Sequence, residues 1–231
     1  MFALAPKDKY SPVVTKLNLF TVFYVPVLSI IISLTDNHFK LGKFENLSVV
    51  LVLGGLEYAK YYFFKSTLTD ADTKSKRKKS SKLERTWKVL SFNVQMVCVI
   101  YVVAVLLGAQ LLNKFQETLM LAVLITTLAI FPITLYTEVD DLFQLLGMIT
   151  MMPSNSYSNL FISQLQTTLV GAWLGATVIP LDWNREWQVW PNSCIYGALA
   201  GFYVTNIYFY IIHSTKIVFR NKKNHKFENV L

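Results

Sequence analysis

Six long apolar runs constrain this chain more than any other feature of its sequence. A helix needs about 20 mostly apolar residues to cross the roughly 30 Å hydrocarbon core of a bilayer. The runs approach that length and are apolar nearly all round, whereas helices of soluble proteins alternate polar and apolar faces. We therefore predict an all-α, polytopic membrane protein, a single transmembrane domain over residues 1–231. Its six predicted spans are 17–34, 47–64, 89–112, 118–136, 160–179 and 194–212.

The first apolar run follows Lys7, Lys9 and Lys16, which is also how a signal peptide begins. This run is long, however, and it ends at residues 33–36 without a small-residue cleavage site. We therefore predict a retained span. Pro26 near its middle is expected to kink it, because proline cannot donate a backbone hydrogen bond.

The net charge of +8 is concentrated in a few segments. Residues 65–88 hold nine Lys and Arg side chains, and the tail 213–231 holds five more. In a multispan protein, dense basic segments indicate the cytosolic side rather than a nucleic-acid partner. Six spans place the N-terminus, the basic loop and the tail together, so we predict both termini to be cytosolic. The connections 36–46, 113–117 and 181–193 are then predicted to face the lumen.

Residues 137–159 form the predicted cytosolic connection after the fourth span. Within them, residues 142–152 are apolar but too few to cross a bilayer. Polar or small residues recur every three positions: Asp141, Gln144, Gly147 and Thr150. We predict an amphipathic helix lying at the cytosolic interface, and a docking surface for a partner helix is the alternative.

The fifth and sixth spans each carry a GxxxG motif, at Gly171 and Gly175 and at Gly197 and Gly201. Residues four apart lie on one helix face, and glycine lets two backbones approach closely. The two spans are joined by a short turn and therefore form a predicted hairpin. The glycines either pack these two helices on each other or pack one of them on another subunit.

The second predicted span contains two charged residues, Glu57 and Lys60, on one helix face. Charges within a membrane are costly and are usually paired or functional. Lys60 lies near the cytosolic end, from which its side chain can extend to the interface. We predict a structural intramembrane pair or a contact with a partner helix, with a proton or ion relay as the alternative.

Residues 181–193, the Trp-rich turn, connect the fifth and sixth spans. Asp182 is placed to cap a short helix and Pro191 to end it. The tryptophans recur at i, i+4 and i+7, and so share one predicted face: Trp183, Trp187 and Trp190. Two interpretations stay open: an interfacial anchor, or a recognition surface in which Arg185 binds a carboxylate or phosphate.

The sequence shows no arrangement typical of a catalytic or metal site. Metal-assisted phosphoryl transfer needs several carboxylates or histidines converging on a cation. The candidates on the predicted lumenal side are scattered singly: Asp36, His38, Glu45, Glu117, Asp182 and Glu186. Cys98 and Cys194 form no CxxC pair and are interpreted as small apolar residues of the spans. We predict no catalytic residues, no metal and no cofactor.

The string I-P-L-D-W-x-R-x-W-Q-V-W-P-x-S-C is long and specific. Its residues here are Ile179, Pro180, Leu181, Asp182, Trp183, Arg185, Trp187, Gln188, Val189, Trp190, Pro191, Ser193 and Cys194, preceded by Gly171, Ala172, Trp173 and Gly175. This stretch of about thirty residues resembles the phosphatidylinositol-glycan biosynthesis class F family, PIG-F. One departure is Glu186, where relatives often carry proline.

The resemblance implies a multi-pass protein of the endoplasmic-reticulum membrane that acts in glycosylphosphatidylinositol (GPI) anchor biosynthesis. It implies a stabilising subunit of the ethanolamine-phosphate transferases of classes O and G, with catalysis in the larger partner. The turn is then a candidate contact with that partner or with lipid, through Asp182, Trp183, Arg185, Trp187, Gln188, Trp190 and Pro191.

Two other functions stay open from the residues alone. The first is a small lipid-phosphate transferase that uses Asp182 and Arg185 of the turn directly. The second is a lipid transporter or scramblase in which Glu57 and Lys60 line a path.

Overall fold

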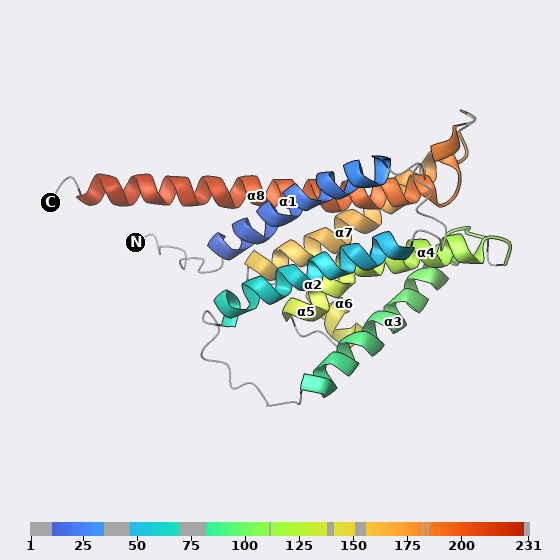
Figure 1. Cartoon of the computed structure of the whole chain (residues 1–231), viewed down its shortest axis with the longest axis horizontal. Helices are drawn as coiled ribbons and strands as arrows, with labels where there is room; N and C mark the ends of the chain where they lie inside the picture. The colour runs from blue at the N-terminus through green and yellow to red at the C-terminus, as the bar shows by residue number, and fades with distance from the viewer. Residues whose placement is uncertain are drawn as a thin grey trace.

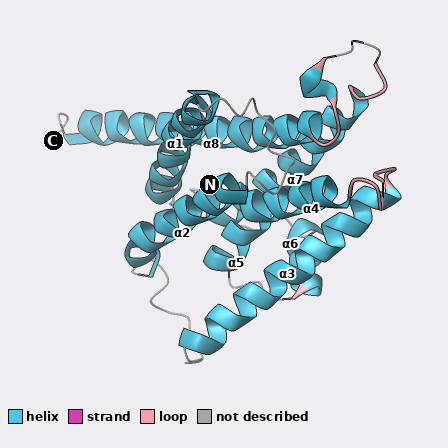
Figure 2. Cartoon of the chain, turned by 45° about the vertical axis from the view of Figure 1, so that its right-hand side comes forward, coloured by secondary structure: helices cyan, strands magenta, loops and turns pink. Residues whose placement is uncertain are grey.

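The computed structural model describes residues 11–34, 47–69, 82–110, 112–137, 141–150, 156–181, 183 and 185–228 (Figure 1). These residues form helices joined by turns and contain no strand, so the predicted all-α class is confirmed over them (Figure 2). The elements are α1 (Ser11–Leu34), α2 (Leu47–Thr69), α3 (Lys82–Leu106), α4 (Phe115–Ile125), the π-helix η2 (Thr126–Ile130), α5 (Phe131–Thr137), α6 (Leu142–Thr150), α7 (Ser156–Thr177), the 3₁₀-helix η3 (Glu186–Gln188) and α8 (Asn192–Glu228).

Four stretches of the described chain are long and apolar enough to cross a membrane: Leu47–Phe64, Leu83–Leu106, Phe115–Thr137 and Asn192–Phe219. Pro12–Leu28 is a shorter apolar helix. The helix α7 is 22 residues long and is not among these four stretches. It carries buried polar side chains, including Gln164 and Thr168. The protein thus has several helices able to span a membrane. The predicted total of six spans and the cytosolic position of both termini stay predictions.

The bundle is centred on the nearly continuous helix α4–η2–α5, which contacts α2, α3 and α7. The longest helix, α8, lies along α7 and also against α1 (Figure 1). The first helix begins and the last helix ends toward one end of the bundle, whereas the Trp-rich turn lies at the other end (Figure 1).

The π-helix η2 in the central span lies directly before Pro132. Proline has no N–H to donate to the carbonyl one turn earlier, so a regular α-helical ladder is interrupted at this position. A π turn is a common way for a helix to absorb such an interruption. The pattern of apolar residues alone predicts one uniform span here and does not reveal the irregularity.

The third helix ends at Leu106, before the predicted end of the span at residue 112. Gly108 takes a φ of 109°, and its N–H donates to the carbonyl of Val105 at 3.0 Å. The N–H of Ala109 donates to the carbonyl of Ala104, also at 3.0 Å. This is the Schellman arrangement, in which glycine adopts the left-handed conformation that ends a helix.

Parts of the predicted connections lie outside the described residues, including 70–81 of the basic loop and 36–46. The described ends of the basic loop belong to α2 and α3, where the Arg85 guanidinium donates to the Leu135 carbonyl at 3.2 Å. The segment predicted as an amphipathic helix contains α6, in which Leu145 is buried and Phe143 exposed, and its place at the cytosolic interface stays a prediction. Residues 138–140 and 151–155 beside it, and 229–231 of the tail, are also outside the described part.

Candidate functional site

The glycines of the two GxxxG motifs lie between α7 and α8. A Cβ atom placed on Gly171 would lie 2.8 Å from the carbonyl carbon of Gly197 and closer still to its oxygen. A Cβ on Gly175 would lie 2.7 Å from the carbonyl carbon of Ser193, and one on Gly201 would lie 2.7 Å from that of Thr167. The motifs therefore pack the two helices on each other, which was one of the two predicted alternatives.

Polar side chains continue the contact between α7 and α8 away from the glycines. The Gln164 side-chain N–H donates to the Asn206 side-chain oxygen at 2.9 Å, and both residues are buried. The hydroxyls of Thr167 and Thr205 share a hydrogen bond of 2.6 Å. Such bonds stabilise helix pairs where water is absent, so the hairpin is joined along much of α7.

Glu57 and Lys60 form the predicted ion pair, with 2.6 Å between Lys60 Nζ and Glu57 Oε2. The exposed fractions of the two residues are 0% and 1%. The Tyr24 hydroxyl donates to Glu57 Oε1 at 2.5 Å, and Lys60 Nζ donates to the Thr21 hydroxyl at 3.0 Å. The pair thus joins α1 to α2 inside the bundle, and Lys60 does not extend to the surface as the sequence suggested.

Gln188 and Trp190 fix the Trp-rich turn to the bundle. The Gln188 side-chain N–H donates to the carbonyl of Val178 at 2.7 Å and also to that of Leu181. The Trp190 indole N–H donates to the Thr118 hydroxyl of α4 at 3.2 Å. The Trp190–Pro191 peptide bond is cis, and α8 begins at the next residue. One buried glutamine and one tryptophan therefore hold the turn against α7 and α4.

The predicted single face of three tryptophans is wrong. Only residues 186–188 are helical, as one turn of 3₁₀-helix, and the i, i+4, i+7 argument needs a longer α-helix. Trp190 packs against the core, whereas Trp183 and Trp187 are 56% and 41% exposed and contact each other with ring centroids 6.2 Å apart. Tertiary contacts at Trp190 override the local periodicity.

Arg185 is exposed beside the tryptophan pair, in extended backbone just before η3. The predicted helix cap Asp182 lies outside the described residues, as does the side chain of Glu186. Pro191 does not end a helix of the turn; its carbonyl accepts a hydrogen bond from the Ile195 N–H at 3.0 Å and so starts α8. A proline just before α8 removes no helical hydrogen bond, because the first N–H groups of a helix have no partner within it.

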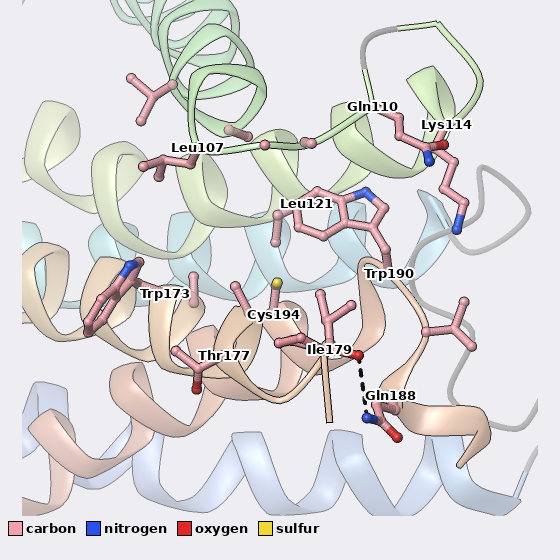
Figure 3. A pocket seen from close by; sticks show the side chains of 18 of the residues that line it. Leu107, Gln110, Lys114, Leu121, Trp173, Thr177, Ile179, Gln188, Trp190 and Cys194 are labelled. Atoms are coloured by element: carbon pink, nitrogen blue, oxygen red, sulfur yellow. Dashed lines mark hydrogen bonds between the residues drawn. The ribbon is translucent and has the colours of Figure 1, made fainter. Parts of the chain in front are cut away.

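A groove with a cavity volume of about 810 Å³ opens between α3, α4, α7 and the Trp-rich turn (Figure 3). Leu107 and Leu121 lie on one side of it, and Trp173 and Cys194 on the other (Figure 3). Lys114 lies at the end of the groove beyond Trp190 (Figure 3). Arg185 also lines the groove.

The described residues contain no group of three or more His, Cys, Asp or Glu side chains that would hold a metal ion. The two cysteines are both free, Cys98 exposed and Cys194 buried. The polar groups that the fold brings together in this part of the chain are therefore hydrogen-bonding and ion-pairing groups.

The family model of the GPI biosynthesis protein family Pig-F matches residues 8–209 of this chain. The chain belongs to the Pig-F family. This assignment covers nearly all the described helices and confirms the resemblance carried by the string around the Trp-rich turn.

Curated Pig-F relatives match about half of the chain. A mouse protein named "GPI ethanolamine phosphate transferase, stabilizing subunit" is 33% identical over 53% of this chain and 56% of its own length. A human protein of the same name is 38% identical over 44% of this chain and 47% of its own length. A Debaryomyces hansenii protein named "Glycosylphosphatidylinositol anchor biosynthesis protein 11" is 30% identical over 47% of this chain and 46% of its own length. The matched region thus spans about half the length of these relatives.

No solved structure matches the chain. The arrangement of the helices is therefore described from the contacts within this chain. Those contacts place residues of the Pig-F string in different environments: Gln188, Trp190 and Pro191 turn inward, Trp183 and Trp187 are exposed, and Arg185 is exposed at the groove.

Sequence reasoning missed several residues that define this site. The Thr118 hydroxyl of α4 accepts a hydrogen bond from the Trp190 indole, and the Tyr24 hydroxyl of α1 donates one to Glu57. Neither residue belongs to a sequence motif. A threonine or tyrosine in an apolar run is an ordinary span residue, so no pattern marks these contacts. In the sequence, Lys114 is one charged residue near the start of a span. Its position in the groove depends on the fold.

Proposed function

We propose that this chain is a stabilising, non-catalytic subunit of an ethanolamine-phosphate transferase in GPI anchor biosynthesis. The single observation that carries the proposal is the Pig-F family match over residues 8–209. The names of the mouse and human relatives, each a "stabilizing subunit", support the accessory role. The proposed partners are the large transferases of classes O and G, in the endoplasmic-reticulum membrane.

The proposed topology has six membrane spans with both termini cytosolic. The antiparallel packing of α7 along α8 supports it, because a helix joined to a spanning helix along its length crosses the same layer. Two polar residues of α7, Gln164 and Thr167, bond to Asn206 and Thr205 of α8. The basic residues 65–88 support the cytosolic assignment of the opposite end from the turn. The Trp-rich turn then faces the lumen.

The proposed contact with the partner uses the exposed surface of the Trp-rich turn. The glycine faces of α7 and α8 are occupied by each other, so they leave no surface for another subunit. Trp183 and Trp187 remain exposed as a pair, and Arg185 beside them is able to bind a carboxylate or phosphate in a bidentate manner. Exposed tryptophan and arginine side chains are the residue types that dominate protein interfaces.

Affinity isolation of the tagged full chain in mild detergent, with identification of stoichiometric partners, tests the proposal. We expect one large transferase subunit per chain and no ethanolamine-phosphate transfer by the isolated chain. Transfer by the isolated chain that disappears in Arg185→Gln, with partner levels unchanged, would instead support the direct lipid-phosphate transferase. Recovery of the chain alone from cells that contain both transferases would overturn the accessory role.

The transporter alternative receives a separate test. Glu57 and Lys60 of α2 are fully buried and paired with each other, and both bond to α1. They do not line the groove. We therefore expect no lipid flux in liposomes that contain the purified chain. Flux that depends on Glu57, and that Glu57→Gln abolishes while the protein stays folded, would contradict this expectation.

A further inference from the structure

The groove beside the Trp-rich turn is large enough for a ligand. Its volume of about 810 Å³ lies within the range of roughly 300–1,000 Å³ typical of small-molecule sites. It is bounded by elements that no single sequence motif joins: the end of α3, the start of α4, the outer side of α7 and the turn. One cavity thus connects the apolar helices with the polar end of the bundle.

The walls between the helices are apolar. Val103 and Leu107 come from α3, Leu121 from α4, and Leu169 and Trp173 from α7. The lining residues on α7 extend from Leu169 to Thr177. This part of the helix is about 12 Å long at the 1.5 Å rise per residue of an α-helix. An elongated apolar slot of this kind suits a hydrocarbon chain better than a compact polar ligand.

Two cations line the same groove. Lys114 comes from the connection that precedes α4, and Arg185 comes from the Trp-rich turn. Neither aspartate nor glutamate is among the described lining residues. A phosphate group complements this pair, because arginine binds phosphate through two parallel hydrogen bonds and lysine adds a point charge.

We propose that this groove binds an anionic glycerophospholipid. One acyl chain lies along α3 and α7, and the phosphate lies at Lys114 and Arg185. A partner helix would also cover the apolar walls, but the two cations among the lining residues favour a ligand that carries an apolar tail and a phosphate together. The proposal goes beyond the accessory role, because it requires only the chain and its membrane.

Photolabelling of the full chain in phosphatidylcholine vesicles tests the proposal. The probe is phosphatidylglycerol with a diazirine in one acyl chain, and the comparison is diacylglycerol with the same diazirine. We expect labelled peptides from 100–109 and 169–177, with about tenfold more labelling by phosphatidylglycerol, since hydrogen bonds to charged groups are among the strongest in proteins. Raised salt should reduce this preference because both cations are accessible to solvent.

Two pairs of variants distinguish a bound lipid from the surrounding bilayer. Lys114→Gln with Arg185→Gln should abolish the preference for phosphatidylglycerol, whereas Lys16→Gln, an exposed lysine of α1, should not. Val103→Trp should block the groove. Its control is Val102→Trp, because Val102 is similarly exposed, 54% against 47%, but does not line the groove. Each variant is used only if it elutes as a monodisperse species.

Three results would overturn the proposal. The first is equal labelling of the groove by the two probes, which is expected of ordinary lipid contact. The second is labelling that persists unchanged in folded Val103→Trp. The third is loss of labelling in the isolated complex with a transferase together with crosslinks from the groove to the transferase, which would make the groove a protein interface. This third result would leave the proposed accessory function standing, so the two ideas fail separately.

Discussion

The two sides of this bundle differ in how completely the chain contacts itself. On the α7–α8 side, glycines bring backbones together and polar side chains bond across the interface. On the α3 side, only 11% of the Leu83–Leu106 stretch is buried, against 28% of the Asn192–Phe219 stretch in α8 and 78% of the central Phe115–Thr137 stretch. The contact between α7 and α8, the closed side, is formed within the chain, whereas most of α3, the open side, is left for lipid or protein. Substitutions on the two sides should therefore have very different effects.

The largest effect is expected from Gly171→Leu on the closed side. A leucine there meets the backbone of Gly197, which cannot move without separating the helices. Overpacking of a core costs about 1–3 kcal/mol and sometimes more, and here both obstructing atoms belong to the backbone. We expect loss of the monodisperse peak on size-exclusion chromatography of the detergent-purified chain.

Gly55→Leu is the matched control for this substitution. Gly55 also lies within a helix, but a Cβ atom there would meet nothing within 4 Å. We expect Gly55→Leu to elute as the wild type does. Equal behaviour of the two variants would show that the α7–α8 contact is not tight.

The next largest effect is expected from Glu57→Gln in the closed core. Removing one partner of a buried ion pair leaves an uncompensated charge and typically costs about 3–5 kcal/mol. Lys60 would keep its bond to Thr21, and the glutamine oxygen could still accept a hydrogen bond, but the glutamine carries no charge to balance the ammonium. Thermal unfolding in detergent should show a strong loss of stability, and the double variant Glu57→Gln with Lys60→Met should recover much of it. A double variant as unstable as the single one would argue against a purely structural pair.

A smaller effect on stability is expected from substitutions at Trp190 and Thr118, beside the groove. The Trp190–Thr118 hydrogen bond joins the Trp-rich turn to α4. A double-mutant cycle with Thr118→Val and Trp190→Phe should give a coupling free energy of about 1 kcal/mol, the usual value for one hydrogen bond. A coupling near zero would mean that the turn is held by Gln188 and by packing alone.

The smallest effect is expected at Trp87, which is 71% exposed near the start of α3. Substitutions away from a packed or bonded position usually change stability by within about 0.5 kcal/mol. Trp87→Ala should therefore leave the melting temperature of the purified chain nearly unchanged. A loss comparable to that of Glu57→Gln would show that the open side is less independent than the structure indicates.

The features that sequence reasoning predicted are those that a single helix or a short repeat determines. The membrane sets the length of an apolar run, and the spacing of Gly171 and Gly175 sets one helix face. The wrong prediction, the shared tryptophan face, assumed a regular helix where contacts with α4 and α7 decide the backbone. The partners of Trp190 and Glu57 depend on how neighbouring helices are rotated, and no local pattern encodes that rotation.

The groove illustrates the same limit. Lys114 and Arg185 are far apart in the sequence and belong to two different connections, so no local pattern indicates that they line one cavity. Gly108 ends α3 early and so forms one edge of the opening. Only the packing of α3, α4 and α7 places these groups around one cavity.

Co-isolation of a class O or class G transferase tests most directly whether the exposed turn is the partner surface. The variant Trp183→Ala with Trp187→Ala removes the exposed pair, and Trp87→Ala removes an exposed tryptophan at α3 as the control. At matched levels of folded chain, we predict at least about a tenfold loss of transferase with the double variant, as expected when interface hot spots are removed. We predict full recovery with Trp87→Ala. Full recovery with both variants would contradict the account.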